Sequence, residues 1–223
     1  MDAKPSLSIV LTFYNEQDVL EEMVTRLRKV CGGELKEVLG RYEMIFVNDR
    51  STDRSQDILL RLAEGHSDIR IINMSRRFGV YPCMMAGFRA ASGDAVVYLD
   101  SDLQDPPEVI AEMVKVWQSE KAEVVHTKRR SRAGESRIKL WITMTGYHLL
   151  RLICDIHIEP NIGDFKLMSR RVVNELLGLR EKNPFVRGLV TWIGFKQVTI
   201  LYDRDARFAG ETLRPVYSWA VIK

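Results

Sequence analysis

A cluster of acidic side chains follows an apolar stretch near the middle of the chain. The run AVVYLD ends at Asp100, and Asp102, Gln104 and Asp105 come within the next five residues. Carboxylates this close repel one another unless a cation lies between them. Mg²⁺ and Mn²⁺ prefer oxygen ligands, and Mg²⁺ usually takes one or two protein carboxylates and completes its shell with water and substrate phosphates. The spacing therefore predicts a Mg²⁺ or Mn²⁺ site at Asp100, Asp102 and Gln104, with a diphosphate as the substrate group.

The same acidic residues have a simpler interpretation as turn formers. Aspartates at strand ends often form turns or cap helices, and Asp105, directly before Pro106, is assigned that role. Short motifs of this kind also arise by chance. Glu16 and Asp49, however, follow two other expected strands, and their convergence favours a binding site. A phosphotransfer receiver or phosphatase is disfavoured, because the segment DSDLQ lacks the threonine of a nucleophile loop.

Apolar periodicity predicts alternating strands and helices in the first half of the chain. Strands are expected at 7–13, 42–49, 69–74, 94–100 and 122–127, and helices at 16–30, 51–65, 81–91 and 106–119. This alternation is typical of a mostly parallel α/β sheet with helices on both faces. Ligands of such sheets bind beyond the carboxyl ends of the strands, which is where the polar residues converge.

The second half of the chain has a different pattern. A long, basic, aromatic helix is expected at 137–156, a short strand and a helix within 160–179, a helix at 183–195 and a strand at 196–205. Six basic residues and one acid between 128 and 139 indicate an anionic partner. The amphipathic helix can lie in the interface of an anionic membrane, or it can pack its apolar stripe on the core.

Composition narrows the class of protein further. A chain of 223 residues with 46% hydrophobic content can form one sizeable core, and a net charge of +3 gives no indication of nucleic acid binding. Cys31, Cys83 and Cys154 form neither a disulfide framework nor a zinc motif, which is typical of a reducing cytosol. The sequence shows neither a signal peptide nor an uninterrupted apolar run of about 18 residues. Its abrupt end at YSWAVIK suggests a longer natural protein.

Five segments occur in a characteristic order along nearly the whole chain: LTFYNE, VNDRSTD, LDSDLQDPP, NIGDFKLMSR and RFAGET. Together they resemble the successive motifs of inverting GT-A glycosyltransferases of the polyprenyl-phosphate type. That family includes dolichyl-phosphate mannose synthase and the bacterial undecaprenyl-phosphate glucosyl- and aminoarabinosyl-transferases. The resemblance implies a GT-A, Rossmann-like, mostly parallel sheet flanked by helices, with amphipathic interface helices in the C-terminal half.

The resemblance also implies roles for individual residues. The nucleotide base and ribose would contact Thr12, Tyr14, Glu16, Val47 and Asp49. Metal and diphosphate would be held by Asp100, Ser101, Asp102 and Gln104, and the donor phosphates also by Lys128 and Arg207. Asp164 would lie near the reacting carbon or the acceptor, which makes Asp102 and Asp164 the candidate catalytic pair. Arg129 and Arg187 are the candidates for binding the acceptor.

Three positions and one longer stretch depart from the family pattern. Thr12 stands where proline is usual, and Arg50 replaces a glycine whose freedom at positive φ would ease the turn. Leu213 stands where a lysine commonly follows GET, with Arg214 one residue displaced. The stretch 80–88 replaces a more polar segment of the donor pocket.

The implied activity is the transfer of a sugar, with inversion, from a UDP- or GDP-sugar to a polyprenyl phosphate at the cytoplasmic face of the inner or plasma membrane. A phosphate acceptor is already anionic, so Asp164 would only position it, whereas a hydroxyl acceptor would require a base. Residues 1–127 would form the nucleotide-sugar half, 128–210 the acceptor half, and 211–223 the start of a membrane-associated region. A soluble transferase acting on a glycan hydroxyl and a non-catalytic nucleotide-sugar-binding module remain as alternatives, and a homo-oligomer is left open.

Overall fold

A computed structural model describes residues 4–130, 162–179, 181 and 184–204 of the chain. The strands are β1 (Ser6–Phe13), β2 (Arg41–Asn48), β3 (Ile69–Asn73), β4 (Ala95–Asp100), β5 (Val124–Arg129), β6 (Ile162–Ser169) and β7 (Gln197–Tyr202). The helices are α1 (Leu20–Gly32), α2 (Ser55–Ala63), α3 (Val80–Ala90), α4 (Val109–Glu120), α6 (Arg170–Gly178) and α7 (Val186–Trp192). The helix expected at 137–156 and the region 211–223 lie outside the described residues.

The strands form one seven-stranded sheet in the order β3-β2-β1-β4-β6-β5-β7. β6 runs antiparallel to both of its neighbours, β4 and β5, and every other pair is parallel. The predicted α/β class with a mostly parallel sheet is therefore confirmed. Because β6 is reversed, its first residues lie at the edge of the sheet where the other strands end.

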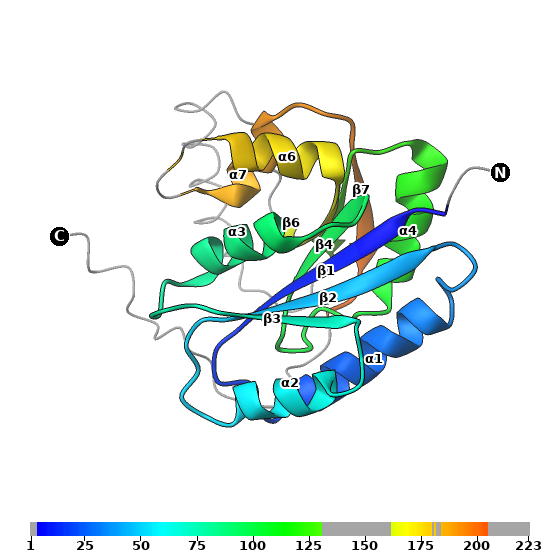
Figure 1. Cartoon of the computed structure of the whole chain (residues 1–223). Coiled ribbons are helices and arrows are strands. Elements are labelled where there is room, and N and C mark those ends of the chain that lie inside the picture. Colours follow the sequence, from blue (N-terminus) through cyan, green and yellow to red (C-terminus); the bar gives the residue numbers. More distant parts are fainter. Residues whose placement is uncertain (1–3, 131–161, 180, 182–183, 205–223) are drawn as a thin grey trace.

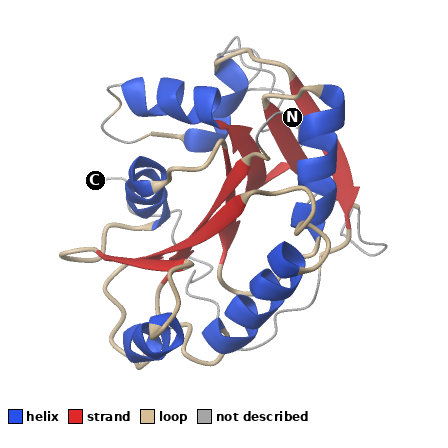
Figure 2. Ribbon diagram, turned by 45° about the vertical axis from the view of Figure 1, so that its right-hand side comes forward, coloured by secondary structure: helices blue, strands red, loops and turns tan. Residues whose placement is uncertain are grey.

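Helices cover both faces of the sheet (Figures 1 and 2). One layer contains α1, α2 and α4, and the other contains α3, α6 and α7. β1 is buried along its whole length, as expected for a central strand between two helical layers. Its side chains alternate between the two cores, since Leu11 packs with the α1 side and Val10 with the α3 side.

Several helices begin later than the sequence predicts, and in two of them, α1 and α4, the delay affects the carboxyl edge of the sheet. The first is expected from residue 16 but starts at Leu20, because residues 16–19 form a turn closed by a hydrogen bond from Val19 N to Glu16 O (3.1 Å). The fourth is expected from Pro106 but starts at Val109, after the turn that contains both prolines. In both cases the extra residues stay at the carboxyl edge of the sheet instead of turning away into a helix.

Helix α3 packs unusually close to the sheet at Gly87. A Cβ atom at this position would lie 2.3 Å from Val10 Cγ1 and 3.2 Å from Val47 Cγ2, so only glycine fits. This close approach seats α3 directly on β1 and β2. The N-terminus of α3, at Gly79 and Val80, consequently lies at the carboxyl edge of these two strands.

The turn after β2 has the left-handed backbone that a glycine would adopt, although Arg50 occupies that position. Arg50 has a φ of 60°, in the left-handed region, and its guanidinium donates a hydrogen bond to Ser75 O (2.7 Å). Asn48 Oδ1 accepts a hydrogen bond from Ser51 N (2.7 Å), which closes the turn from the other side. The arginine therefore changes the chemistry of this turn without changing its left-handed backbone.

Candidate active site

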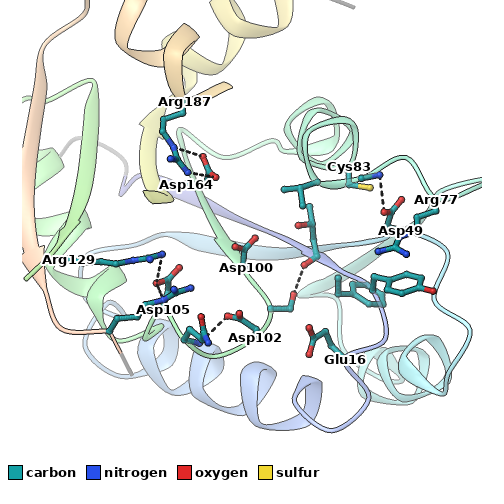
Figure 3. A pocket seen from close by; sticks show the side chains of 18 residues that line it. Glu16, Asp49, Arg77, Cys83, Asp100, Asp102, Asp105, Arg129, Asp164 and Arg187 are labelled. Carbon is teal, nitrogen blue, oxygen red and sulfur yellow. Dashed lines mark hydrogen bonds and ion pairs between the residues drawn. The ribbon is translucent and has the colours of Figure 1, made fainter. Parts of the chain in front are cut away.

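A cavity of about 520 Å³ opens at the carboxyl ends of β1, β2 and β4 (Figure 3). It is the kind of position where ligands of parallel sheets bind. The predicted site residues that line it are Thr12, Tyr14, Glu16, Asp49, Asp100, Ser101, Asp102, Gln104, Arg129, Asp164 and Arg187. The convergence that the sequence predicts is therefore present in the structure.

Asp100, the last residue of β4, is held by a buried pair of hydroxyl groups. Tyr98 Oη donates a hydrogen bond to Asp100 Oδ1 (2.7 Å). Tyr98 Oη also lies 2.8 Å from Thr12 Oγ1. A tyrosine hydroxyl has one proton to give, so Thr12 donates to Tyr98 while Tyr98 donates to Asp100. The Thr12 hydroxyl thus contacts Asp100 through Tyr98, and these two hydrogen bonds fix the orientation of the Asp100 carboxylate.

Burial raises the pKa of Asp100 to about 6. The hydrogen bond from Tyr98 opposes this shift, whereas the negative charges of Asp102, Asp105 and Asp164 add to it. The ionised form of Asp100 is thus destabilised by a site crowded with carboxylates. A divalent cation is what such a donor set would accept, because its charge offsets the repulsion.

The loop after Asp100 presents the remaining oxygen ligands. Asp102 Oδ1 accepts a hydrogen bond from Gln104 N (3.1 Å), and Leu103 between them has a φ of 55°. Ser101 Oγ donates to Thr12 O (3.0 Å), which ties the loop to β1. No three His, Cys, Asp or Glu side chains in the described part of the chain form a metal cage. A cation here would therefore take two carboxylates and the Gln104 amide, and complete its shell with water or phosphate.

The role of Asp105 differs from the turn-forming or helix-capping role that the sequence suggests. The residue does not cap a helix, since α4 starts at Val109 without a side-chain cap. It is only 3% exposed, and its Oδ1 accepts a hydrogen bond from Tyr202 Oη (2.5 Å). Arg204 Nε lies 3.2 Å and a terminal nitrogen of Arg129 3.8 Å from the same oxygen. Asp105 therefore anchors two arginines at the cavity, which a turn-forming role does not predict.

Asp49, after β2, organises the loop that precedes α3. Its two carboxylate oxygens accept hydrogen bonds from Phe78 N (2.6 Å) and Gly79 N (2.9 Å). Burial, together with the nearby Asp49 carboxylate, raises the pKa of the Cys83 thiol to about 12. Asp49 thus has a structural function in this loop. A bound ligand would donate to the lone pairs of the Asp49 carboxylate that accept no hydrogen bond from the loop.

An aromatic ring and a guanidinium group form a second side of the cavity. The Arg77 guanidinium lies over the ring of Tyr14, 4.0 Å from its centroid, and both residues line the cavity. Cation–π stacking of this kind holds a flexible arginine against a flat surface. Glu16, close by, is buried, and its backbone N donates to Ser55 Oγ (2.9 Å).

Asp164 reaches the cavity because β6 is antiparallel. Tyr98 on β4 is paired with Lys166 on β6, and the same register continued by two residues sets Asp164 opposite Asp100. Arg187, from α7, holds the Asp164 carboxylate with two hydrogen bonds, from a terminal nitrogen to Oδ2 (2.9 Å) and from Nε to Oδ1 (3.4 Å). Figure 3 shows this pair on one side of the cavity, with Asp49 and Glu16 on other sides and Asp100 between them.

Two predicted residues, Val47 and Lys128, do not line the cavity, and a third lies outside the described residues. Val47 is fully buried in the core under α3, so its side chain has a packing role and its expected contact with a base is not supported. Lys128 lies on β5 but not among the residues that line the cavity. Arg207 lies outside the described residues, so its expected role with the donor phosphates stays a prediction.

Two arginines that line the cavity were missed. Arg77 follows β3, beyond the strand expected at 69–74, whereas Arg204 follows β7 in the structure but lies inside the strand expected at 196–205. The strand-end rule that finds Asp49 and Asp100 also indicates Arg77, but it gives no signal for Arg204 when that strand is expected to continue to residue 205.

The seven-stranded sheet with helices on both faces defines a GT-A-like α/β fold, and comparison with known proteins identifies the family. Residues 8–177 match the description "Glycosyl transferase family 2", and the chain belongs to this family. It is similar to the uncharacterized glycosyltransferase YkcC of Bacillus subtilis, with 46% identity over 94% of this chain and 63% of the relative. It is also similar to the bactoprenol glucosyl transferase of Shigella phage SfV, with 36% identity over 92% of this chain and 65% of the relative.

A solved structure has the same fold. The mannosyltransferase PcManGT from Pyrobaculum calidifontis, in complex with GDP-Man and Mn²⁺, superposes with a TM-score of 0.61 at 19% identity, covering 90% of this chain and 56% of the other. The chain spans less than two thirds of the length of both curated relatives. The predicted family and the predicted enzyme class, a glycosyltransferase, are therefore confirmed.

Proposed function

We propose that this glycosyltransferase moves a sugar, with inversion, from a nucleoside-diphosphate sugar to a polyprenyl phosphate. One observation carries the proposal. A single cavity contains the acidic loop of Asp100 and Asp102 and, opposite Asp100 in register, the Asp164–Arg187 pair. The first group suits a metal-bound diphosphate, and the second suits an anionic acceptor approaching the sugar from the other side.

The donor would occupy the part of the cavity formed by β1, β2 and the acidic loop. Tyr14, with Arg77 stacked on it, offers a flat surface of the kind on which a nucleotide base can lie. The solved relative binds GDP-Man with Mn²⁺. In this chain Asp100, Asp102 and Gln104 would hold Mg²⁺ or Mn²⁺, which supplies positive charge for the departing diphosphate.

The acceptor would occupy the part of the cavity lined by β6, α7 and the end of β5. The bactoprenol glucosyl transferase relative has 36% identity over 92% of this chain, and its name specifies a polyprenyl acceptor. Arg187 and Arg129 line the cavity and give this side the cationic groups that a phosphate needs. A phosphate oxygen is already ionised near neutral pH, so the acceptor does not depend on removal of a proton.

The protein's contribution to the reaction is position and charge. An acceptor oxygen forms a bond to the anomeric carbon as the bond from that carbon to the diphosphate oxygen breaks on the opposite face, which inverts the configuration. Asp164, fixed by Arg187, would orient the acceptor beside that carbon. Arg204, anchored on Asp105, would face the phosphates of the leaving group.

The proposed acceptor is a membrane lipid, so the enzyme would act at the cytoplasmic face of the inner or plasma membrane. In the described part of the chain, no helix has the length and apolarity that a bilayer crossing demands. The amphipathic segment predicted at 137–156 lies outside the described residues. Contact of this segment with the membrane surface is part of the proposal.

The test offers the full chain three acceptors with radiolabelled UDP- and GDP-sugars. Undecaprenyl phosphate, undecaprenol and a soluble oligosaccharide are compared in detergent, with Mg²⁺ or Mn²⁺ and with excess chelator. The proposal expects label only on undecaprenyl phosphate, and no transfer in chelator. Label on the oligosaccharide would instead establish the soluble transferase. Donor binding without transfer to any acceptor would establish the non-catalytic module.

A further inference from the structure

Lys166, beside the Asp164–Arg187 pair, is a buried cation that the reaction as proposed above does not use. The residue is 1% exposed, and within the described residues its Nζ has no hydrogen-bond partner. The nearest carboxylate oxygen, Asp164 Oδ1, is 4.0 Å away. Burying an ammonium group with so little compensation is costly, so a hydrophobic residue would stabilise this strand better.

The lysine changes the charge of the acceptor corner, defined here as Asp164, Lys166 and Arg187. Asp164 and Arg187 alone would neutralise each other. With Lys166 the corner holds two cations and one carboxylate, which is a surplus of one positive charge. A phosphomonoester carries the opposite charge, whereas a neutral hydroxyl gains nothing from the surplus.

We propose that Lys166 is a positioning residue for an anionic acceptor: it keeps Asp164 paired within a net cationic corner, so that an acceptor phosphate is attracted and not repelled by this carboxylate. This inference rests on the proposed function and deepens it, because it assigns the preference for phosphate over hydroxyl to a residue behind the cavity wall. Lys166 itself does not line the cavity, and it acts through Asp164 and Arg187.

The environment of Lys166 makes this role testable by pH. Burial lowers the pKa of Lys166 to about 8, with Arg187 adding to this effect and Asp164 opposing it. The surplus charge is therefore present below pH 8 and is lost as the pH rises above that value. Two further titratable side chains lie on the strands that flank Lys166. They are Tyr98 on β4 and His126 on β5, which are paired with Lys166 in the sheet.

The variants are Lys166→Met, Lys166→Arg and the matched control Met168→Leu. Met168 lies two residues further along β6, on the same face and equally buried, so its replacement disturbs packing without changing charge. Methionine fills the space of a lysine and needs no partner. Because it removes a poorly compensated charge, Lys166→Met is expected to melt at the same temperature as the wild type or higher, while a purely structural lysine would give a lower melting temperature.

The measurement is the binding of geranyl phosphate, a water-soluble prenyl phosphomonoester, to the full chain by titration calorimetry between pH 7 and pH 9.5. The wild type should lose about tenfold in affinity as the pH rises through 8, which is the size expected for one charge near a half-buried site. Lys166→Met should be about tenfold weaker at pH 7 and flat across the range. Lys166→Arg should bind like the wild type at pH 7 and stay flat, and Met168→Leu should follow the wild-type curve.

The outcomes separate this inference from the proposed function. A step near pH 8 that survives in Lys166→Met belongs to another group, such as His126, and overturns the inference. So do equal affinities of wild type and Lys166→Met at pH 7, or the absence of any binding to the wild type with or without UDP and GDP. Geraniol, which lacks the phosphate, should bind all variants alike. If undecaprenyl phosphate accepts sugar but Lys166→Met binds geranyl phosphate normally, the inference fails and the proposed function stands.

Discussion

The two sides of the cavity are built in different ways. The donor side comes from the ends of the parallel strands β1, β2 and β4. Two of its carboxylates are held by neutral groups, since Asp100 accepts from the Tyr98 hydroxyl and Asp49 accepts from backbone N–H groups. The acceptor side comes from the reversed strand β6 and from α7, and there Asp164 is held by the charged groups of Arg187 and Lys166.

This difference predicts different consequences of removing a carboxylate. In the acidic loop of the donor side the carboxylates repel one another, so neutralising Asp100 or Asp102 relieves this repulsion while it damages the proposed metal site. On the acceptor side a carboxylate compensates two cations, so its loss removes the nearest carboxylate from the buried Lys166 and breaks the ion pair with Arg187. Loss of a carboxylate from the acidic loop should therefore lower activity without lowering stability. Loss of Asp164 on the acceptor side should lower both.

The largest expected effect is on transfer in Asp102→Asn. We expect a loss of roughly a thousandfold or more, because the proposed cation loses one of its two carboxylates. The free energy of unfolding should stay the same or rise, since repulsion with Asp100 is relieved. Transfer kinetics and urea unfolding check both parts, with Asp18→Asn, an exposed carboxylate outside the cavity lining, as the control. Undiminished turnover would refute the site assignment.

Asp164→Asn should lower both activity and stability. Breaking a buried ion pair costs about 3–5 kcal/mol, and the partial exposure of Asp164 and Arg187 reduces this to about 2 kcal/mol. Urea unfolding of Asp164→Asn and of the double variant Asp164→Asn/Lys166→Met gives the measurement. The double variant should recover part of the stability, because it restores the charge balance. An Asp164→Asn protein as stable as the wild type would remove the contrast between the two sides.

Asp49→Ala should act through the loop before α3. It leaves Phe78 N and Gly79 N without their carboxylate acceptor, which costs about 1–3 kcal/mol where these groups stay buried. We expect a higher KM for the donor with a smaller change in kcat, because the loop beside the cavity loses its anchor. Asp49→Asn, which keeps one acceptor oxygen, is the matched comparison. A donor KM equal to that of the wild type in Asp49→Ala would show that the loop does not border the donor.

The smallest effect should come from Arg50→Gly. Glycine relieves the left-handed backbone at φ 60°, but it loses the hydrogen bond to Ser75 O and gains freedom in the unfolded chain. These contributions oppose one another, so the change in unfolding free energy should stay within about 1 kcal/mol. Thermal unfolding checks this. A larger loss would mean that the guanidinium, and not the backbone, maintains the turn at this end of the donor side.

The donor side of the site could be predicted because its signals are local. Each of its strands is a short apolar run, and the polar residues that follow, such as Asp49, Asp100 and Asp102, reach the same edge in any parallel sheet. The side-chain contacts could not be predicted in this way. Tyr98, within the apolar strand β4, donates a hydrogen bond to Asp100. Asp105 accepts a hydrogen bond from Tyr202, which lies 97 residues away in the sequence.

By itself, the sequence determined the α/β class, the acidic loop and the family, since apolar periodicity and contiguous motifs require no knowledge of distant neighbours. Only the tertiary structure decided the acceptor corner. The insertion of β6 between β4 and β5 in the reverse direction brings Asp164 to the carboxyl edge, and α7 then supplies Arg187. The direction and neighbours of a strand depend on long-range pairing and on how two helical layers pack, and a short apolar run contains no local signal for either.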